Sequence, residues 1–210
     1  MMEVVVTNRV QRLAASAMLA VLVVCALGGA DATHAPKPFP REWHWASNGR
    51  QWQFCKQALG QPAPALQVGD WLNGEFKLED VKGKIVLYDF WATWCGPCIA
   101  AIPHTNMLMD KYAKQGFAVV GVCNTRGSDK MVRTAQAKGM RFPTAPDIAD
   151  RSASRFGVQW WPYFVLTDRK GVIRAAGLQT LSVELAIDAL LKEQPMVDKD
   201  APAEDDEDTN

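Results

Sequence analysis

The chain is poor in the residues that build metal sites and disulfide frameworks. It has three histidines and five cysteines in 210 residues, and Cys95 and Cys98 are its only closely spaced thiols. A second C-x-x-C or a His-x-x-His partner is missing, so we expect no metal site. Because 48% of the residues are hydrophobic, one domain can bury a sufficient core without a disulfide framework.

Net charge is also lacking, since 23 basic residues balance 23 acidic ones. The distribution is uneven: residues 198–210 hold seven acids and one lysine, whereas residues 33–197 hold 20 bases and 14 acids. The terminal run has almost no apolar content, so we predict a disordered acidic tail over residues 195–210. We expect no nucleic-acid partner, and we expect a monomer.

The sequence has no apolar run long enough for an ordinary transmembrane helix. The longest, Leu13–Leu27, has 15 residues, short of the roughly 20 that span a bilayer. Arg9 and Arg12 precede it and Ala30-Asp31-Ala32 follows, which is the layout of a secretory signal peptide. We predict a signal peptide over residues 1–32 and export to the periplasm or another extracytoplasmic space, with a membrane anchor as the alternative if it is not cleaved.

The most informative feature present is Cys95-Gly96-Pro97-Cys98, which follows an apolar run at 85–91. A cysteine at a helix N-terminus lies near unpaired N–H groups and the positive end of the helix dipole, which favour its thiolate. Cys95 is the predicted nucleophile, and Cys98, one turn later, is the predicted resolving thiol. Pro97 suits a first helical turn. The two can form a redox-active disulfide, and the alternative is a purely structural one.

Downstream of Pro64 the pattern alternates between strands and helices and predicts an α/β domain over residues 61–194. Asn73-Gly74 indicates a short N-terminal β-hairpin, and Ser182 is the expected cap of the last helix. The predicted strands are 66–71, 75–78, 84–91, 117–123, 163–167 and 172–176, and the predicted helices are 98–114, 129–138, 147–156 and 182–192.

The segment Asp89-Phe90-Trp91-Ala92-Thr93-Trp94-Cys95-Gly96-Pro97-Cys98, with Pro103 and Trp161-Pro162, resembles the thioredoxin superfamily. Together with the predicted export signal, it is most similar to the secreted TlpA/ResA-like (redoxin) branch. The resemblance covers about Gln61 to Lys192. It implies a thioredoxin fold, in which a central mixed sheet is flanked by helices, and thiol-disulfide exchange without a cofactor.

Asp89 is a further predicted catalytic residue. A charge inside an apolar strand is costly unless it is paired, hydrated or neutral. The resemblance places this carboxylate behind the thiols, where burial would raise its pKa and let it pass a proton to or from Cys98. The alternative is an acid satisfied by Lys84 or Lys114 and water.

The resemblance also implies a cis peptide bond before Pro162, whose loop would present the substrate chain. Trp94, Gly96, Pro97, Trp161 and Pro162 are therefore the predicted substrate-binding residues. The family more often has a small β-branched residue before this proline, so Trp161 would reshape the groove. The alternative is that Trp160 or Trp161 only packs on Trp94 or Trp91.

Residues 33–60 form an aromatic-rich extension that we expect to contain a linker and a short amphipathic element packed on the domain, with a partner-binding patch as the alternative. It contains Cys55, which could bridge Cys123 in an oxidising compartment, although Cys123 also suits a buried core thiol. His34, His44 and His104 are expected to be surface or half-buried side chains.

The sequence therefore predicts an exported thiol-disulfide oxidoreductase that reduces disulfides of extracytoplasmic proteins, such as apocytochrome-like substrates, with electrons from a membrane donor. One alternative is a redoxin-type thiol peroxidase, but the proline of a Pro-x-x-x-Thr/Ser-x-x-Cys pocket is missing before Cys95. The other is a thiol-based copper-binding protein, which would carry Cys-x-x-x-Cys and a distal histidine.

Overall fold

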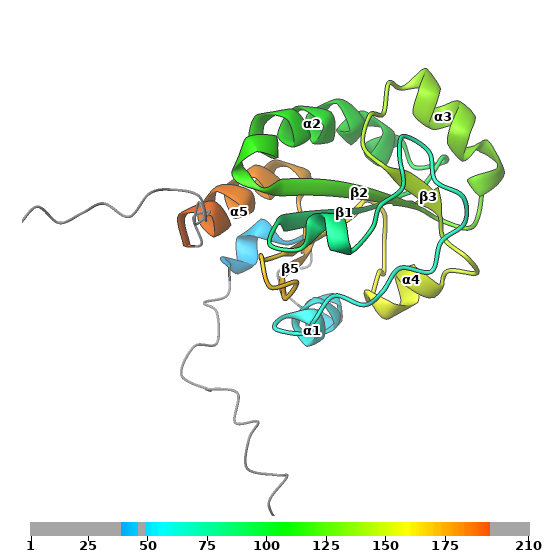
Figure 1. The fold of residues 1–210 in the computed structure, drawn as a ribbon. Helices are drawn as coiled ribbons and strands as arrows, with labels where there is room; N and C mark the ends of the chain where they lie inside the picture. Colours follow the sequence, from blue (N-terminus) through cyan, green and yellow to red (C-terminus); the bar gives the residue numbers. More distant parts are fainter. Residues whose placement is uncertain (1–38, 46–48, 194–210) are drawn as a thin grey trace, which may run out of the picture. The chain divides into compact units, whose positions relative to one another are not determined.

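Five strands form one mixed sheet in the order β3-β2-β1-β4-β5 (Figure 1). The computed structural model describes residues 39–45 and 49–193, so the predicted signal peptide, Cys25, His34 and the acidic tail lie outside the described residues. β1 pairs in parallel with β2, and β2 with β3, whereas β4 is antiparallel to both β1 and β5. The prediction of an α/β fold with a central mixed sheet is confirmed. The strands are β1 (Ile85–Trp91), β2 (Phe117–Cys123), β3 (Thr144–Pro146), β4 (Tyr163–Thr167) and β5 (Ile173–Leu178).

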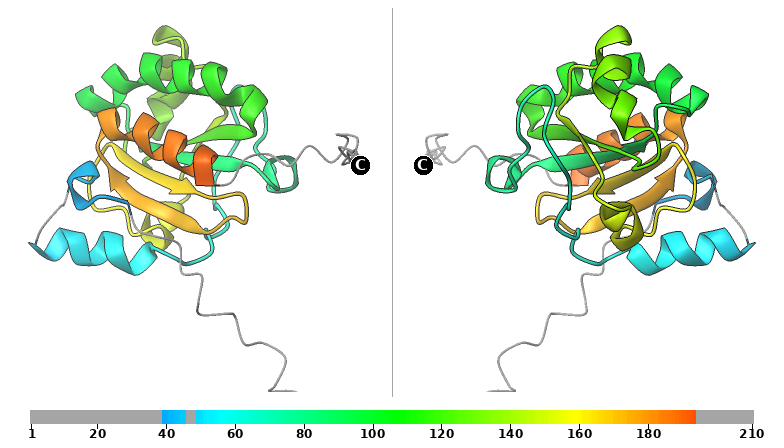
Figure 2. Two further views of the ribbon diagram at one scale, coloured as in Figure 1. Left: turned by 90° about the vertical axis from the view of Figure 1, so that its left-hand side faces the viewer. Right: turned by 90° about the vertical axis from the view of Figure 1, so that its right-hand side faces the viewer.

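Helices cover both faces of this sheet (Figure 2). Buried side chains of α2, α3 and α5 join the apolar cluster on one face, and those of α1 and α4 join the cluster on the other. The α-helices are α1 (Gly49–Ala58), α2 (Gly96–Tyr112), α3 (Met131–Ala137), α4 (Arg151–Arg155) and α5 (Thr180–Glu193). The short 3₁₀ helices are η3 (Arg41–Trp43), η4 (Glu79–Val81), η5 (Ala113–Gln115) and η6 (Ser128–Lys130).

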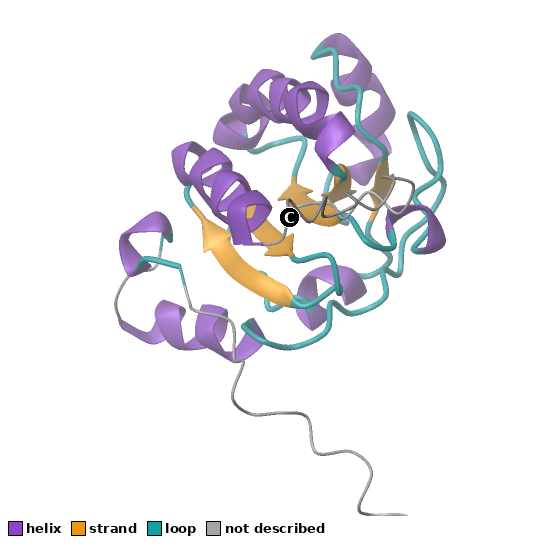
Figure 3. Cartoon of the chain, turned by 60° about the vertical axis from the view of Figure 1, so that its left-hand side comes forward, coloured by secondary structure: helices purple, strands orange, loops and turns teal. Residues whose placement is uncertain are grey.

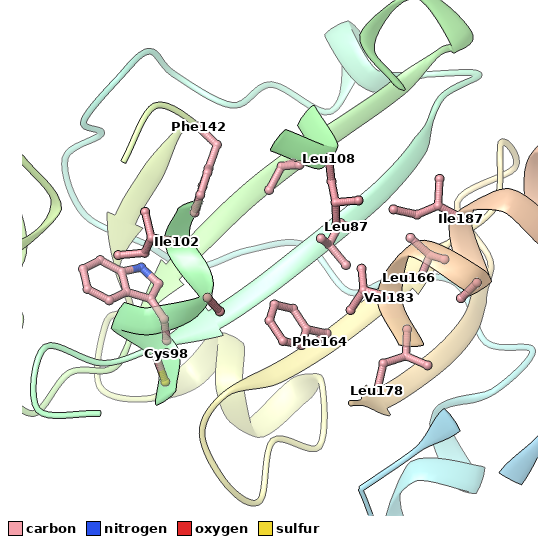
Figure 4. Packing of buried hydrophobic residues seen from close by; sticks show 14 of the residues in the cluster. Leu87, Cys98, Ile102, Leu108, Phe142, Phe164, Leu166, Leu178, Val183 and Ile187 are labelled. Carbon is pink, nitrogen blue, oxygen red and sulfur yellow. The ribbon is translucent and has the colours of Figure 1, made fainter. Parts of the chain in front are cut away.

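The central strand β1 explains the two-sided core. All seven of its residues are buried, as expected for a strand covered on both faces. Leu87 points into the cluster beneath α2 and α5, and Tyr88 and Phe90 into the opposite one. Figure 4 shows Leu87 packed among side chains of α2, α5 and β4. Because the strand is apolar on both sides, it fixes where the following helix begins.

Most predicted elements are present, with shifted ends. The predicted strand at 163–167 is β4, the predicted helix at 129–138 divides into η6 and α3, and the predicted helix at 147–156 shrinks to α4. The strand β3 was missed because it has three residues, ends in Pro146 and pairs only with β2 and the segment before β1. Such a short edge strand leaves no alternating pattern in the sequence.

The predicted N-terminal hairpin around Asn73-Gly74 is wrong. Neither half pairs with the other; instead Leu72 exchanges backbone hydrogen bonds with Thr144, and the Gly69 N–H donates to Pro146 O. Asn73 does adopt a left-handed conformation, with φ of 63°. Its side-chain amide donates to the carbonyls of Met140 and Phe142, so the turn docks the segment on the β3 edge.

The last helix begins earlier than predicted. α5 starts at Thr180, so Ser182 lies inside its first turn and is not the cap. The Ser182 N–H already donates to the carbonyl of Gln179. The predicted capping role of Ser182 is therefore wrong.

The described parts of the extension, residues 39–45 and 49–60, pack on the β5 edge (Figure 3). Trp45 N–H donates to Gly177 O, and Gly60 N–H donates to Ile173 O. α1 is the amphipathic element expected there, and it buries Cys55. Within residues 39–45 and 49–193, no helix is long and apolar enough to span a membrane.

Candidate active site

Cys95 and Cys98 lie at the junction of β1 and α2 and are joined by a disulfide. This is the oxidised form of the predicted redox pair. Cys95 occupies the N-cap position of α2, and the Cys98 N–H donates to Cys95 Sγ at 3.2 Å. Pro97 lies in the first turn, where its missing N–H leaves no hydrogen bond unmade. Once reduced, Cys95 would face the positive end of the helix dipole, which favours a thiolate over a thiol.

The surface around the disulfide is formed mainly by its neighbours. Cys95 is 5% exposed and Cys98 2%, whereas Trp94 is 46% exposed. Gly96 and Pro97 are also exposed, and a Cβ at Gly96 would meet nothing within 4 Å. The approach to the sulfur atoms is therefore open above Gly96. Cys98 packs beneath it in the same apolar cluster as Ile102 (Figure 4).

Asp89 is buried, with 2% of its surface exposed. Its side chain faces α2, where Thr105 is a hydrogen-bond partner, and its Oδ1 has no hydrogen-bond partner. Burial raises the pKa of this carboxyl from its ordinary value of 3.8 to about 7, and the Thr105 hydroxyl offsets only part of the shift. No described lysine forms an ion pair with Asp89. The alternative interpretation, in which Lys84 or Lys114 neutralises this acid, is therefore wrong. The carboxyl can take up and release a proton near neutral pH.

The Trp161-Pro162 bond is cis, as expected. The Trp161 ring meets the Trp94 ring edge to face at a centroid distance of 5.7 Å. Trp160 turns away and packs on Tyr163 at 5.1 Å. The structure therefore packs Trp161 on Trp94, the residue before Cys95, and places Trp160 with the apolar cluster on the opposite face of the sheet.

Three residues that the sequence interpretation missed hold this surface in place. Thr93 Oγ1 donates to Gly127 O at 2.9 Å, and Trp94 Nε1 donates to Arg126 O at 2.8 Å. Gly127 has a φ of 85°, and a Cβ there would lie 2.5 Å from Thr93 Oγ1. The topology could have indicated these residues. Because β1 and β2 are parallel, they end at the same edge of the sheet, and the segments that follow them meet there.

The other two described cysteines are separate buried thiols. Cys55 belongs to the cluster on the α1 face and Cys123 to the cluster on the α2 face, so the sheet separates them. The possible Cys55–Cys123 bridge is not formed, and Cys123 is the buried core thiol that its strand suggested. Burial raises the pKa of Cys55, and raises the pKa of Cys123 to about 12.

His44 also differs from expectation, because it is fully buried. Its Nδ1 lies 2.8 Å from Ala176 O, and burial lowers its pKa. His104 is half-buried, as expected. Within the described ranges, no three His, Cys, Asp or Glu side chains gather where they could hold a metal ion.

A helix-capping C-x-x-C disulfide beside a cis-proline loop, on a mixed sheet flanked by helices, defines a thioredoxin-fold dithiol protein. The chain belongs to the AhpC/TSA family, whose model matches residues 59–176. The thiol-disulfide oxidoreductase ResA of Geobacillus thermodenitrificans is 32% identical over 60% of this chain and 73% of its own length. ResA of Bacillus anthracis is 30% identical over 56% of this chain and 68% of that protein.

Solved structures agree with the fold. A putative thiol:disulfide interchange protein DsbE from Chlorobium tepidum has a TM-score of 0.56 and 31% identity, covering 63% of this chain and 97% of that one. A thioredoxin-like protein in the oxidised form has a TM-score of 0.57 and 29% identity, covering 64% of this chain and 97% of that one. The predicted thioredoxin fold is confirmed, and the chain is a thiol-disulfide oxidoreductase of the ResA-like type.

Proposed function

We propose that this protein works outside the cytoplasm and reduces disulfides of other proteins at Cys95 and Cys98. The observation that carries the proposal is the Cys95–Cys98 disulfide at the N-terminus of α2, with the buried Asp89 carboxyl on the adjoining strand. Such a pair exchanges two electrons with a substrate by cycling between its dithiol and disulfide forms.

The reaction proceeds in two exchanges. The Cys95 thiolate attacks one substrate sulfur, forms a mixed disulfide and expels the other substrate sulfur as a thiolate, which takes up a proton. The Cys98 thiol then loses its proton, attacks Cys95 Sγ and expels the second substrate thiolate. The substrate gains two electrons and two protons, and the enzyme is left with the Cys95–Cys98 disulfide.

Asp89 is the group we assign to the proton of Cys98. Cys98 is nearly inaccessible to solvent, so a proton acceptor within the protein would assist its ionisation. A carboxyl whose pKa is raised to about 7 is half ionised at neutral pH, so it can accept this proton and later return one.

The proposed substrate groove runs over Trp94, Gly96, Pro97, Trp161 and Pro162. The cis-proline loop exposes a backbone edge with which an extended substrate segment can pair. The two tryptophans provide an apolar side to this groove. Apocytochrome-like proteins with a disulfide in an extended segment fit this description.

Export rests on the predicted signal peptide over residues 1–32. In the proposed cycle the protein acts as a monomer and uses no cofactor, since the dithiol pair needs only an electron source. A membrane-bound dithiol donor reduces the Cys95–Cys98 disulfide after each turnover. The ResA relatives are named as thiol-disulfide oxidoreductases, which supports the reaction type.

The reduction potential of the Cys95/Cys98 pair tests the direction of the reaction. We expect a value near that of thioredoxin, about −270 mV, and turnover of an insulin disulfide by the reduced protein. A value near about −120 mV, as in strong oxidants, contradicts the reductant assignment. In parallel assays, faster turnover of hydrogen peroxide than of insulin would favour a peroxidase, and tight Cu(I) binding with no insulin reduction would favour a copper carrier.

A further inference from the structure

A cation lies against the exposed tryptophan beside the disulfide. The guanidinium carbon of Arg126 is 4.3 Å from the centre of the Trp94 ring. The Trp94 indole N–H donates to the backbone carbonyl of the same arginine at 2.8 Å. Because Cys95 directly follows Trp94, these two contacts hold a positive charge at the rim of the reactive site.

The backbone that carries Arg126 is held by hydrogen bonds on both sides. The Arg126 N–H donates to Asn124 Oδ1 at 3.2 Å, and Gly127 O accepts from Thr93 Oγ1. The Asn124 side-chain amide in turn donates to Asp150 Oδ1 at 2.9 Å. A side chain that is carried on a fixed backbone and packs on the Trp94 ring has little conformational freedom to lose when a partner binds it.

The Arg126 charge has no ion-pair partner in the part of the chain that the structure describes. The nearby carboxylate of Asp150 accepts hydrogen bonds from Asn124 and Thr125. Asp129, three residues further along, is exposed and forms no ion pair with a described residue. No described residue accepts a hydrogen bond from the guanidinium, so its planar set of N–H donors is available to a ligand.

The two sides of Trp94 therefore differ. Trp161 contacts it on the cis-proline side at 5.7 Å and is apolar. Arg126 contacts it on the side of the segment that follows β2 and is cationic. An extended peptide crossing the disulfide would meet an apolar side chain at one end of its path and a positive charge at the other.

We propose that Arg126 is a specificity-determining residue that binds an acidic side chain flanking the target cysteine of the substrate. The proposal rests on the proposed function, since it concerns the substrates of the same disulfide exchange. Arg126 presents charge-assisted hydrogen-bond donors to the carboxylate, and Trp94 supports the guanidinium from beneath. An exposed pair of this kind corresponds to a preference of about two- to five-fold in kcat/KM.

The test uses three peptide disulfides that differ at one position, with Asp, Asn or Lys next to the scissile cysteine. kcat/KM is measured for the reduced wild-type protein and for Arg126→Gln, Arg126→Lys and Arg133→Gln. Arg133 is exposed on α3 and forms no ion pair with a described residue, so Arg133→Gln removes the same charge away from the groove. We expect the wild type and Arg133→Gln to prefer the Asp peptide, Arg126→Gln to lose the preference, and Arg126→Lys to retain part of it.

Salt provides a second measurement, since the wild-type preference should shrink as ionic strength rises. The proposal is overturned if the ratio of kcat/KM for the Asp peptide to that for the Asn peptide is the same in wild type and Arg126→Gln. It is also overturned if Arg133→Gln lowers this ratio as much as Arg126→Gln does, because the preference would then come from the general surface charge. The Asn peptide separates the two levels of the account. If the Asn peptide is turned over but the Asp-to-Asn ratio does not depend on Arg126, only the specificity is overturned. If no peptide is turned over, the proposed function is overturned and this inference with it.

Discussion

The described part of the chain holds two pairs of cysteines in opposite situations. Cys95 and Cys98 lie at the N-terminus of α2 and are bonded to each other. Cys55 and Cys123 are fully buried on opposite faces of the sheet and remain free thiols. All four are little exposed, so burial alone does not distinguish them.

The difference lies in what surrounds each sulfur atom. Cys95 accepts a backbone N–H and has the open surface of Gly96 and Pro97 above it. Cys123 ends an apolar strand, where burial raises its pKa to about 12. A thiol with so high a pKa is almost entirely protonated at neutral pH, so we expect Cys123 to be unreactive. A position at a helix N-terminus with surface access therefore distinguishes Cys95, the proposed nucleophile, from the two buried core thiols.

The largest effect should come from exchanging the nucleophile. Cys95→Ser removes the proposed nucleophile, so insulin reduction should fall by on the order of 10³ or more, to the uncatalysed rate. Cys55→Ala is the matched control, because that thiol touches Tyr163 in the core and not the site. The comparison between the two pairs breaks down if Cys55→Ala loses as much activity as Cys95→Ser.

The next effect concerns Asp89 and the pH dependence of stability. Its pKa is raised on folding, so the native state retains a proton that the unfolded state has lost between pH 3.8 and about 7. The stability supplied by this proton is fully present below pH 3.8 and is lost as the pH rises to about 7, a fall of up to about 4 kcal/mol. Asp89→Asn should remove that fall in denaturant unfolding measured at several pH values.

Asp89→Asn also tests whether Asp89 carries a proton for Cys98 or is only a buried acid that lowers stability. If Asp89 serves Cys98, Asp89→Asn should slow resolution of a trapped mixed disulfide at pH 7 and abolish the inflection near pH 7 in its rate. An unchanged rate with an altered stability curve would leave Asp89 without a catalytic role.

A smaller effect should come from the segment that supports Trp94. Gly127→Ala forces a Cβ into a left-handed backbone position 2.5 Å from Thr93 Oγ1. We expect a loss of about 1–3 kcal/mol in the free energy of unfolding and a change in Trp94 fluorescence. Gly139→Ala is the control: its φ of 66° is also left-handed, but a Cβ there meets nothing within 4 Å. Equal effects in the two variants would show that the Thr93 contact adds nothing.

The residues of the candidate active site could be predicted from the sequence because their chemistry is local. Cys95, Pro97 and Cys98 form a contiguous motif at a strand-to-helix junction, and Asp89 is the one charge in an apolar strand. Each of these features depends only on a few residues that are neighbours in the sequence, so the sequence alone predicts them.

The parts that the sequence did not reveal depend on distant partners. Asn73-Gly74 has the composition of a hairpin turn, but the segment before it does not pair with the segment after it. Instead, Leu72 forms backbone hydrogen bonds with Thr144, which lies 71 residues beyond Asn73. Arg126 becomes part of the site only because β1 and β2 end at the same edge. The separation of Cys55 from Cys123 likewise follows from which sheet face each element covers.

The most direct test of the contrast between the two pairs is alkylation of the fully reduced, folded protein at pH 7, with peptide mass spectrometry over time. The account predicts that Cys95 is modified first, and that Cys55 and Cys123 stay unmodified until denaturant is added, because burial raises the pKa of both. Modification of Cys55 or Cys123 in the folded protein at a rate similar to that of Cys95 would contradict it.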